Sequence, residues 1–564
     1  MPARAEGYGH DQPVPGLRLP HYRRENLSGD VMAALTGAAV LVPQSMAYAQ
    51  IAQLPPVVGL YASVVPLLVY SLLGRTPQLG VGPLATISIV GAVGVGKLEP
   101  AGSAEFIALS ATLAVIVGIA HILIGVCRLG FLVRFLSEPV MTGFLSGISV
   151  LLIATQLGPL TGVPLGTGGG RADEIVVDWL KGLDDASLAT TAVGVIVVAG
   201  LLLARRWRRF PSALLAVIVA SLAALVFDLE SHGVAIVGEV PSGLATPEAP
   251  PWAWDDVRVL IGTALAITLI SVLESMSLAR TFAEEHDQEV EPNREIAAIG
   301  ASNVAAGFFQ GMVVTSAISR STIIDEAGAR TQLSGALCAL IVAPLLMFGT
   351  ETFRYIPIAA LAAVVIAAML PLIKVAEARR LWRVQRADFW VMLLAFFGTM
   401  VLGLEAGILV AVAASVALIV YRVSRPRIPE LGRVPGTDWF LEVGRHPDAV
   451  TYPGTAILRM EASLYFTNAD SLTARLRRLE RERPDLHTLV LDASGIDVLD
   501  STGDHTLRKL VARYRDRGIR LLLVNVDEEV RAVMDASGFT TLVRADAFFA
   551  SDADALAQLE TAAR

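Results

Sequence analysis

The sequence QLGVGP at residues 78–83 opens a glycine-rich apolar segment, Leu79–Val95, that is too irregular for an ordinary membrane span. Non-helical backbone survives inside hydrocarbon only where protein or a cavity covers it. Pro83 suits the first residue of a helix, because its missing N–H costs nothing there. We therefore expect a half-helix from Pro83 that directs its dipole and its free N–H groups into the protein. Those N–H groups belong to Leu84, Ala85 and Thr86.

The sequence TSAISRS at residues 315–321 predicts a second half-helix. It belongs to Ser316–Ala327, a partly apolar segment that contains Arg320. A helix from about Ser319 would direct the N–H groups of Arg320, Ser321 and Thr322 into the same kind of cavity. Two opposed helix N-termini with an arginine form a site for an anion, and such interrupted segments in two halves of a chain indicate a transporter's midplane site. The alternatives are a kink at Pro83, a loop at 316–321 and an Arg320 that snorkels.

Longer apolar runs surround these two segments, and each approaches the roughly 20 residues that a bilayer crossing requires. The first series is Val31–Ile51, Val57–Leu73, Phe106–Val126, Val140–Leu157, Leu188–Ala204, Ser212–Phe227 and Val259–Leu278. The second series is Ile296–Met312, Gln332–Phe348, Ile358–Ile373, Phe389–Leu404 and Ile408–Tyr421. The chain is therefore a polytopic α-helical membrane protein.

The composition agrees with a membrane part followed by an aqueous part. Hydrophobic residues make up 54% of the 564 residues and charged residues 17%, against roughly 25% in a typical soluble domain. Charge is sparse between Leu27 and Tyr421 and dense after Arg433. The net charge of −8 argues against a nucleic-acid partner. Cys127, Cys338 and the eight histidines show no metal-ligand spacing, and no Walker motif is present, so we expect no metal, no cofactor, no enzymatic activity and no ATP-driven transport.

Basic residues in the short loops predict the orientation. They cluster at 205–209, 374–386 and 422–427, and Arg128 and Arg134 lie between two spans. If both short segments cross the bilayer, all these clusters fall on one side, and the acidic or neutral loops 158–187 and 228–256 fall on the other. The basic side is cytoplasmic by the positive-inside rule. We expect a multi-pass protein of the inner (plasma) membrane, with the N-terminal segment 1–30 and the C-terminal domain in the cytoplasm.

Three further polar residues lie in apolar spans and are candidates for the site. Glu274 is an intramembrane carboxylate, which is a functional candidate by default. It could bind H⁺, coordinate Na⁺, pair with Arg320, or serve as a structural acid between helices. Gln44 and Tyr48 are one helical turn apart, so they share a face and could line the site. Ordinary hydrogen bonding between helices would explain them equally well.

The tail after the transport domain (31–428) predicts a small α/β domain. Residues 429–436 are rich in Pro and Gly and read as a linker, and 437–564 as the domain. Alternating strands and helices are typical of an α/β fold. The expected strands are Ala456–Met460, Ser463–Phe466, Thr488–Asp492 and Arg520–Asn525, and the expected helices are Asn468–Arg483, Ser501–Arg517 and Glu528–Ser537.

These segments resemble the SulP family of sulfate permeases over nearly the whole chain. The matching motifs are LVPQSMAYA at 41–49, GLYAS at 59–63 followed by Pro66, QLGVGP at 78–83, GFFQG at 307–311 and SRS at 319–321. Two positions depart from the family pattern. Val58 replaces an aromatic residue, and Arg75-Thr76 replaces a pair of small residues. Both lie outside the expected site.

The resemblance implies fourteen helices in two inverted repeats of seven, divided into a core and a gate domain. It also implies an elevator-like movement and a homodimer. The tail resembles a STAS domain through LVLDAS at 489–494 and VLDSTG at 498–503. In soluble relatives the serine after this aspartate can be phosphorylated, which places a possible regulatory phosphosite at Ser501. Asp500 or Ser501 could equally serve only as the cap of the following helix.

The leading interpretation is secondary active uptake of a small inorganic anion, with sulfate favoured by the motif at 41–49 and with H⁺ as the coupling ion. Na⁺-coupled bicarbonate transport is the close alternative, because Glu274 could be a cation ligand, and dicarboxylates come third. An anion exchanger, an anion channel, and a membrane-bound signalling scaffold remain as other classes. The expected partners are the anion, the lipid bilayer and a second copy of the chain, and the sequence indicates none for the STAS-like domain.

Overall fold

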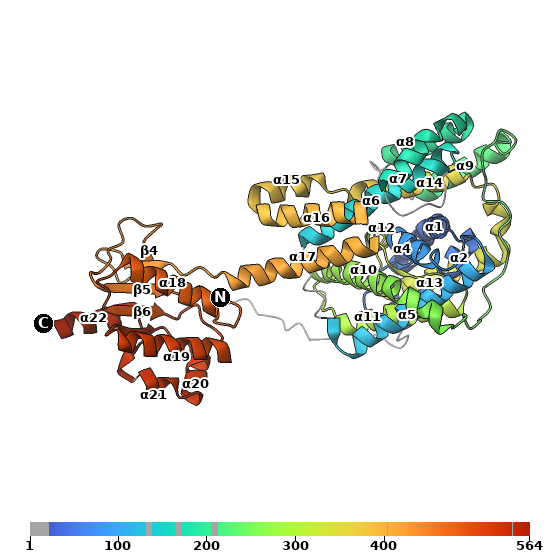
Figure 1. Cartoon of the computed structure of the whole chain (residues 1–564). Coiled ribbons are helices and arrows are strands. Elements are labelled where there is room, and N and C mark those ends of the chain that lie inside the picture. The colour runs from blue at the N-terminus through green and yellow to red at the C-terminus, as the bar shows by residue number, and fades with distance from the viewer. Residues whose placement is uncertain are drawn as a thin grey trace, which may run out of the picture. The chain divides into compact units, whose positions relative to one another are not determined.

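The computed structural model describes residues 22–130, 138–164, 172–204, 212–402, 404–543 and 545–563. The contacts divide the chain into two units, Met1–Ser415 and Val416–Arg564. The first unit is helical apart from one short strand pair, and the second contains a mixed sheet (Figure 1). The division falls within one long helix, Leu404–Ser424.

The helical elements follow the order that the apolar runs predict. Among the described residues, six helical segments could each cross a membrane by length and hydropathy, and shorter apolar helices lie between them. When α2 and α3 are taken as one broken crossing, fourteen candidate crossings result. The first seven are α1 (Leu27–Ile51), α2 (Pro56–Tyr61) with α3 (Val65–Leu73), α4 (Ala85–Val95), α5 (Ala104–Val126), α6 (Glu138–Thr161), α8 (Leu188–Ala204) and α9 (Ser212–Val226). The second seven are α10 (Trp254–His286), α11 (Pro292–Phe308), α12 (Ile318–Glu326), α13 (Leu333–Phe348), α14 (Ile358–Met369), α16 (Arg386–Leu402) and α17 (Leu404–Ser424).

Some boundaries differ from the sequence prediction. The run Val57–Leu73 is broken into two helices, because Val64 takes a backbone conformation that interrupts the ladder. Two amphipathic helices, α7 (Ala172–Lys181) and α15 (Val375–Val384), lie in regions expected to be loops. The basic cluster at 205–209 and Arg134, on which the orientation partly rests, lie outside the described residues.

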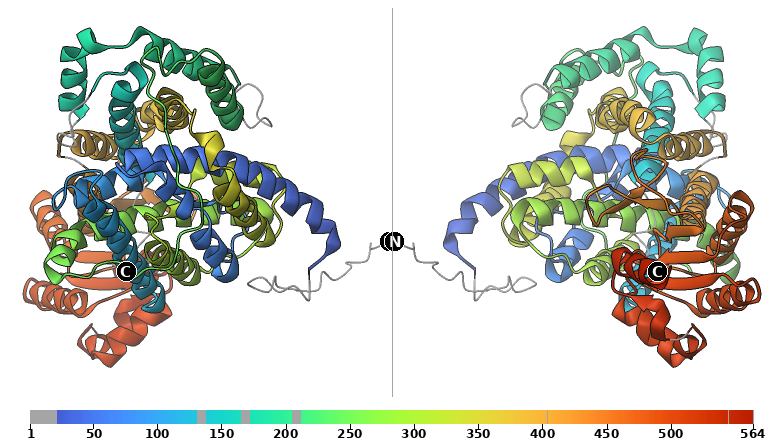
Figure 2. Two further views of the ribbon diagram at one scale, coloured as in Figure 1. Left: turned by 90° about the vertical axis from the view of Figure 1, so that its right-hand side faces the viewer. Right: turned by 90° about the vertical axis from the view of Figure 1, so that its left-hand side faces the viewer.

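The crossings pack into two sets. The core set consists of α1–α5 and α10–α13, and its most extensive pairings are α5 with α11 and α1 with α13. The gate set consists of α6, α8, α9, α14, α16 and α17, and α14 packs against both α6 and α8. The teal helices α8 and α9 lie together at the top of the helical part in both figures (Figures 1 and 2). The sets meet where α1 packs against α14 and α9 and where α4 packs against α6.

Close packing of α5 against α11 depends on glycine. A Cβ on Gly118 of α5 would lie 2.7 Å from the carbonyl oxygen of Gly300, and a Cβ on Gly300 would lie 2.8 Å from the carbonyl oxygen of Gly118. Neither distance leaves room for a side chain, so the two backbones are in direct contact. Small residues at such crossings are typical of helix association in membranes, where van der Waals packing replaces the hydrophobic effect.

The second unit is a six-stranded sheet covered by helices. The strand order is β4-β3-β5-β6-β7-β8, with β3 antiparallel to both its neighbours and the remaining pairs parallel. The strands are β3 (Glu430–Arg433), β4 (Phe440–Glu442), β5 (Thr455–Arg459), β6 (Thr488–Asp492), β7 (Arg520–Val524) and β8 (Phe548–Phe549). The helices are α18 (Ala469–Glu482), α19 (Ser501–Asp516), α20 (Glu528–Ala536), α21 (Phe539–Val543) and α22 (Asp552–Ala563). Leucines of α18, α19 and β6 form its main buried cluster.

Two details of the tail correct the sequence prediction. The expected linker 429–436 contains β3, which pairs with β5 and so belongs to the sheet. The expected strand at Ser463–Phe466 does not form. Asn468 accepts a hydrogen bond from the N–H of Tyr465 (3.0 Å) and donates one to the carbonyl oxygen of Ser463 (2.9 Å), which turns this segment into α18. Only a single bridge, Leu464 with Leu499, remains there.

Candidate functional site

The two broken segments meet as a pair of short antiparallel strands. In β1 (Val81–Gly82) and β2 (Thr315–Ser316), Val81 pairs with Ser316 and Gly82 with Thr315. Strand β1 leads into α4, the third crossing of the first seven, and β2 leads into α12, the third crossing of the second seven. Because the strands are antiparallel, the helices that follow them run in opposite directions with their N-termini at the same place. The structure thus confirms that both segments are interrupted helices at matching positions.

The helices begin close to the predicted residues but not at them. Leu84 is extended and caps α4, so the helix begins at Ala85, two residues after Pro83. Ser88 N–H donates to Leu84 O (2.9 Å) and closes the first turn, which leaves the N–H groups of Ala85, Thr86 and Ile87 without an intrahelical acceptor.

In the same way α12 begins at Ile318, one residue before the predicted start. Ser321 N–H donates to Ala317 O (2.9 Å), so the free N–H groups are those of Ile318, Ser319 and Arg320. The Ser321 hydroxyl accepts the N–H of Gly80 (3.0 Å). Ser321 therefore ties the two segments together, whereas its N–H and that of Thr322, which follows it in the helix, are not directed at a ligand as expected.

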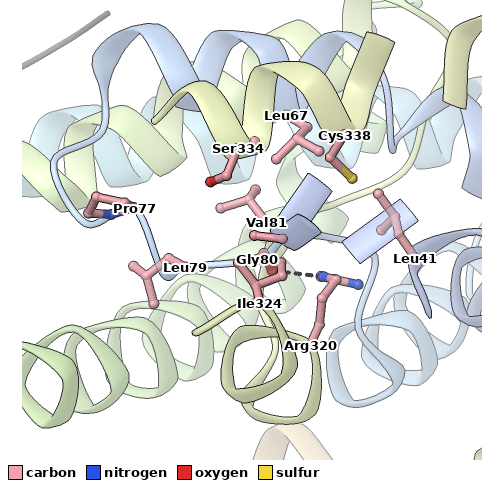
Figure 3. A pocket seen from close by; sticks show the side chains of 12 residues that line it. Leu41, Leu67, Pro77, Leu79, Gly80, Val81, Arg320, Ile324, Ser334 and Cys338 are labelled. Atoms are coloured by element: carbon pink, nitrogen blue, oxygen red, sulfur yellow. Dashed lines mark hydrogen bonds between the residues drawn. The ribbon is translucent and has the colours of Figure 1, made fainter. Parts of the chain in front are cut away.

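Arg320 lies buried against the first broken segment (Figure 3). Its Nε donates to the carbonyl oxygen of Gly80 (2.9 Å) and its Nη1 to that of Pro83 (3.4 Å), while Nη2 has no partner among the described residues. A Cβ on Gly82 would lie 3.1 Å from Nη2, so glycine is what admits the guanidinium. The enclosed cavity beside it measures about 10 Å³, near the minimum for one water molecule. This cavity is therefore too small to hold a polyatomic anion.

Several buried polar side chains around the helix N-termini lack partners among the described residues. Gln44 Nε2 lies 3.5 Å from Ser319 Oγ, at the limit of a hydrogen bond, and Gln44 Oε1 has no donor. The hydroxyls of Thr86 and Ser88 on α4 are also buried and unpaired. Buried groups of this kind are rare unless a ligand or water completes them. Ser88 was not predicted, although it lies two residues after Thr86 in a segment that the sequence had singled out.

Glu274 lies on α10 in the same region and is buried. Its Oε2 has no hydrogen-bond partner, and no ion pair with Arg320 is present in the described part of the chain. Both Glu274 and Arg320 are close enough to Tyr48 to act electrostatically on its buried hydroxyl. The structure therefore brings Gln44, Tyr48, Glu274 and Arg320 to one region, and it favours a free carboxylate over a Glu274–Arg320 pair.

A chain of buried hydroxyls, which the sequence analysis missed, connects α10 to β2. His121 Nδ1 lies 2.8 Å from the carbonyl oxygen of Val117, which can only accept, so Nδ1 carries the proton. The other nitrogen, Nε2, then accepts from Ser271 Oγ (3.0 Å). This fixes the direction of the bonds from Thr315 to Ser271 (2.7 Å), from Ser275 to Thr315 (3.0 Å) and from Ser316 to Ser275 (2.7 Å). The i, i+4 spacing of Ser271 and Ser275 in an apolar helix was the available signal.

Other buried polar side chains hold the broken segments in place. The amide of Asn303 on α11 pairs with the backbone of Val314, donating to its carbonyl oxygen (2.8 Å) and accepting its N–H (2.9 Å). Asp30 at the start of α1 accepts the N–H groups of Arg330 (2.8 Å) and Thr331 (3.0 Å), just after α12. Each of these side chains bonds a backbone N–H or carbonyl group that a regular helix would have bonded internally, so the irregular backbone keeps its hydrogen-bond partners.

The described residues bring together one group with metal-ligand potential. The ligand atoms of Glu285, His286 and Asp325 lie within 4.8 Å of one another at the ends of α10 and α12. His286 Nε2 lies 2.7 Å from Asp325 Oδ1, so these two side chains are already hydrogen-bonded to each other. Two of the three side chains are exposed, which is common without a bound ion.

In the tail, the motif around Ser501 caps a helix. Asp500 is the N-cap of α19 and accepts the N–H of Gly503 (2.7 Å) with one oxygen and that of Phe466 (2.8 Å) with the other. Ser501 itself is exposed in the first turn. The capping role therefore belongs to Asp500, and a phosphate at Ser501 stays a prediction.

Two acidic residues of the tail, Asp492 at the end of β6 and Asp552 at the start of α22, interact electrostatically. Burial alone would raise the pKa of Asp492, but hydrogen bonds from Arg459 (2.5 Å), Asn525 (3.0 Å) and Ser494 N–H (3.0 Å) lower it. Burial and the neighbouring charge of Asp492 raise the pKa of Asp552 to about 7. Oδ1 of Asp552 has no partner among the described residues. The two carboxyls therefore differ in charge near neutral pH.

Known sequences match both units of the chain. Residues 27–395 match the sulfate permease family and residues 446–555 match the STAS domain. A probable sulfate transporter of Mycobacterium tuberculosis is 35% identical over 539 residues, which cover 95% of this chain and 96% of the relative. The chloroplastic sulfate transporter 4.1 of Arabidopsis thaliana is 32% identical over 546 residues, covering 93% of this chain and 79% of the relative.

A solved structure supports the same arrangement. The murine anion transporter Slc26a9, in its inward-facing state, superposes with a TM-score of 0.89 at 26% sequence identity. The match covers 96% of this chain and 93% of that chain, so it extends over both units. The fold is therefore a fourteen-helix inverted repeat of seven plus seven with a C-terminal STAS domain.

Proposed function

The chain belongs to the sulfate permease family, and from this premise we propose that it takes up sulfate by secondary active transport coupled to H⁺. Membership makes it a multi-pass membrane transporter of a small anion rather than an enzyme. The names of its relatives as sulfate transporters support sulfate as the anion.

One observation carries the proposal. The N-termini of α4 and α12 meet at the β1–β2 pair, and together they present six N–H groups that have no intrahelical acceptor, beside the unpaired Nη2 of Arg320. Helix N-termini bind anions because the N–H groups and the helix dipoles both favour negative charge. Sulfate has four oxygens that accept hydrogen bonds in different directions, which suits donors that converge from two helices and one guanidinium.

Glu274 supplies the coupling in this proposal. A carboxylate near the bound dianion would repel it, and protonation of Glu274 removes that repulsion. The unpaired Oε2 leaves an oxygen at which a proton can be held. Substrate and proton then favour each other's binding, which is the thermodynamic requirement for symport. Movement of the core set against the gate set, in an elevator-like manner, would carry both across the membrane.

The test is uptake of labelled sulfate into proteoliposomes at fixed Na⁺, with and without an inward proton gradient. We expect uptake that rises with the gradient and disappears when a protonophore collapses it. If uptake ignores the proton gradient but, in a second series at equal pH on both sides, follows an inward Na⁺ gradient, Na⁺ replaces H⁺ as the coupling ion at Glu274. Absence of sulfate uptake under every gradient would refute sulfate as the substrate, and bicarbonate and dicarboxylates would then be the anions to test.

The topology and assembly are part of the proposal. We place both termini and the STAS domain in the cytoplasm, because the basic loops at 374–386 and 422–427 then lie inside. A homodimer is expected from the family resemblance. Accessibility of single cysteines introduced at the polar segment 239–242 and at Lys374 would test the orientation, since only the former should react with an impermeant thiol reagent outside the cell.

A further inference from the structure

A large apolar groove separates part of the core set from part of the gate set. Its volume is about 1550 Å³, beyond the roughly 300–1,000 Å³ of a pocket for a drug-sized ligand. One wall comes from α1 and α13 of the core set and the other from α9 of the gate set. Wall residues such as Leu35, Ile218 and Leu222 are 50%, 51% and 57% exposed. No described segment of the chain fills this space.

The walls point to hydrocarbon as the occupant. They are built from membrane-spanning helices, and their side chains are those of Leu, Val, Ile, Ala, Met, Pro and Phe, with Ser221 as the one hydroxyl that α9 contributes to the lining. Water in such a groove would find almost no hydrogen-bond partner, whereas a lipid tail is as apolar as leucine. Acyl chains of a bilayer lipid therefore fit the groove.

One end of the groove is polar and carries charges of both signs. There the segment 239–242 lies along 350–356, held by backbone bonds from Val237 N–H to Ile356 O (2.9 Å) and from Gly238 N–H to Arg354 O (3.1 Å). Arg354 lies 3.7 Å from Glu239, and Glu351 is a second exposed carboxylate in the lining. A single cation with two carboxylates would repel an anionic headgroup but complements a zwitterionic one.

We propose that this groove binds one phospholipid with a primary-amine headgroup, that is, a phosphatidylethanolamine. Arg354 donates to the phosphate, Glu239 and Glu351 accept hydrogen bonds from the ammonium, and the acyl chains lie along α9 between α1 and α13. A quaternary choline has no N–H to donate to the carboxylates, and a glycerol headgroup has no positive charge. The headgroup chemistry therefore selects the lipid, while the apolar walls hold it.

The position of the groove connects this lipid to transport. Val42 and Met46 of α1 line the groove, and Gln44 and Tyr48 of the same helix face the anion site. The lipid therefore supports the back of the helix whose other face carries site residues. Any movement of the core set against the gate set must also change the groove, because its walls belong to both sets. The expected effect on transport rests on the proposed function, whereas lipid retention does not.

The experiment measures which lipid stays bound to the purified full-length protein. The protein is reconstituted with equal amounts of phosphatidylethanolamine, phosphatidylcholine and phosphatidylglycerol and then extracted, and its retained lipid is identified by native mass spectrometry. We expect one retained phosphatidylethanolamine per chain and about tenfold weaker retention of phosphatidylcholine, the value of one charge-assisted hydrogen bond. Equal retention of all three lipids, or none, would overturn the proposal.

Two variants and one control locate the site. Leu222→Trp places a larger side chain across the path of the acyl chains and should lower retention, whereas Ile196→Trp on α8, where the side chain is 69% exposed outside the groove, should leave retention unchanged. The double variant Glu239→Gln/Glu351→Gln changes two exposed side chains and keeps the apolar walls intact. It should therefore retain a lipid but lose the preference for phosphatidylethanolamine. Retention in Leu222→Trp equal to the control, or an unchanged preference in the double variant, would also refute the site.

A second copy of the chain could instead cover the groove. In that case Leu222→Trp would change the mass of the assembly and no lipid would be retained, which contradicts the proposal. Sulfate uptake in liposomes with and without phosphatidylethanolamine forms a separate arm. If lipid is retained but no uptake occurs in any lipid, the proposed function fails and the lipid site stands. If uptake occurs equally with and without the retained lipid, the link to transport is wrong.

Discussion

Replacing Arg320 by lysine or alanine separates the two tasks of this side chain. Nε and Nη1 donate to the carbonyl oxygens of Gly80 and Pro83, which have left the helix ladder, and Nη2 is unpaired beside the helix N-termini. Two nitrogens therefore hold the broken segment in shape, and the third is available to the anion. Lysine keeps the positive charge but has one nitrogen, which cannot reach all three directions at once.

The structure sets the expected magnitudes. Alanine leaves the buried carbonyl oxygen of Pro83 without its side-chain donor, whereas that of Gly80 keeps the N–H of Ala317 (3.3 Å), so Arg320→Ala should destabilise the protein by about 1–3 kcal/mol. Lysine can donate to only one of the two carbonyl oxygens, so the stability of Arg320→Lys should lie between that of Arg320→Ala and that of the wild type. A charge-assisted hydrogen bond to the anion contributes about 1.5–3 kcal/mol, so the lysine variant should bind sulfate roughly 10- to 150-fold more weakly.

The assay combines thermal unfolding in detergent with sulfate binding by titration calorimetry. Arg330→Ala is the matched control, because the Arg330 side chain is exposed and only its backbone N–H is engaged, by Asp30. We expect the control to keep the wild-type melting temperature and sulfate affinity. Both Arg320 variants should lose stability and sulfate affinity, and Arg320→Ala should lose more than Arg320→Lys. Wild-type sulfate affinity in Arg320→Lys would remove Nη2 from the anion site. Wild-type stability in Arg320→Ala would refute the structural role of the two carbonyl contacts.

Three further predictions concern the coupling acid and the tail. Glu274→Gln should keep sulfate exchange but abolish the response to a proton gradient, which for one coupled proton is about tenfold in accumulation per pH unit. The pKa of Asp552 is about 7 in the folded protein, against an ordinary value of 3.8. The contribution of this carboxyl group to stability is therefore full below about pH 4 and is lost as the pH rises through 7. In an expressed STAS fragment, Asp552→Asn should raise the melting temperature at pH 8, and the difference from the wild type should shrink toward pH 4. Removal of residues 426–564, which takes β3 out together with its sheet, should lower expression or rate but keep the order of preferred anions.

Each of these predictions has its own control. Glu326→Gln on α12 changes an exposed acid near the site helices and should leave coupling intact. If Glu274→Gln still follows the proton gradient, the coupling proton is held elsewhere. Asp554→Asn alters an exposed acid in the first turn of α22, and a pH response equal to that of Asp552→Asn would exclude burial as the cause. A changed anion preference after the deletion would contradict a purely regulatory tail.

The sequence by itself determined the elements whose signal is local. A long apolar run needs no partner to be recognised, because the bilayer requires about 20 such residues whatever surrounds them. The glycines and Pro83 around residue 80 break a helix through their own backbone chemistry, and the family motifs at 41–49 and 78–83 stand in the printed order. The broken helices, the buried acid Glu274 and the α/β tail could all be found in this way.

Only the tertiary structure decided which of these residues meet. Gly80 and Ser321 are hydrogen-bonded although 241 residues separate them, and no local pattern encodes that distance. The pairing moved the start of α4 past Pro83, because Arg320 and β2 hold this backbone extended. The direction of the hydroxyl chain from Ser316 depends on which nitrogen of His121 carries the proton, and this follows from the carbonyl it faces. Backbone breaks are local chemistry, but the partners that satisfy them come from the whole fold.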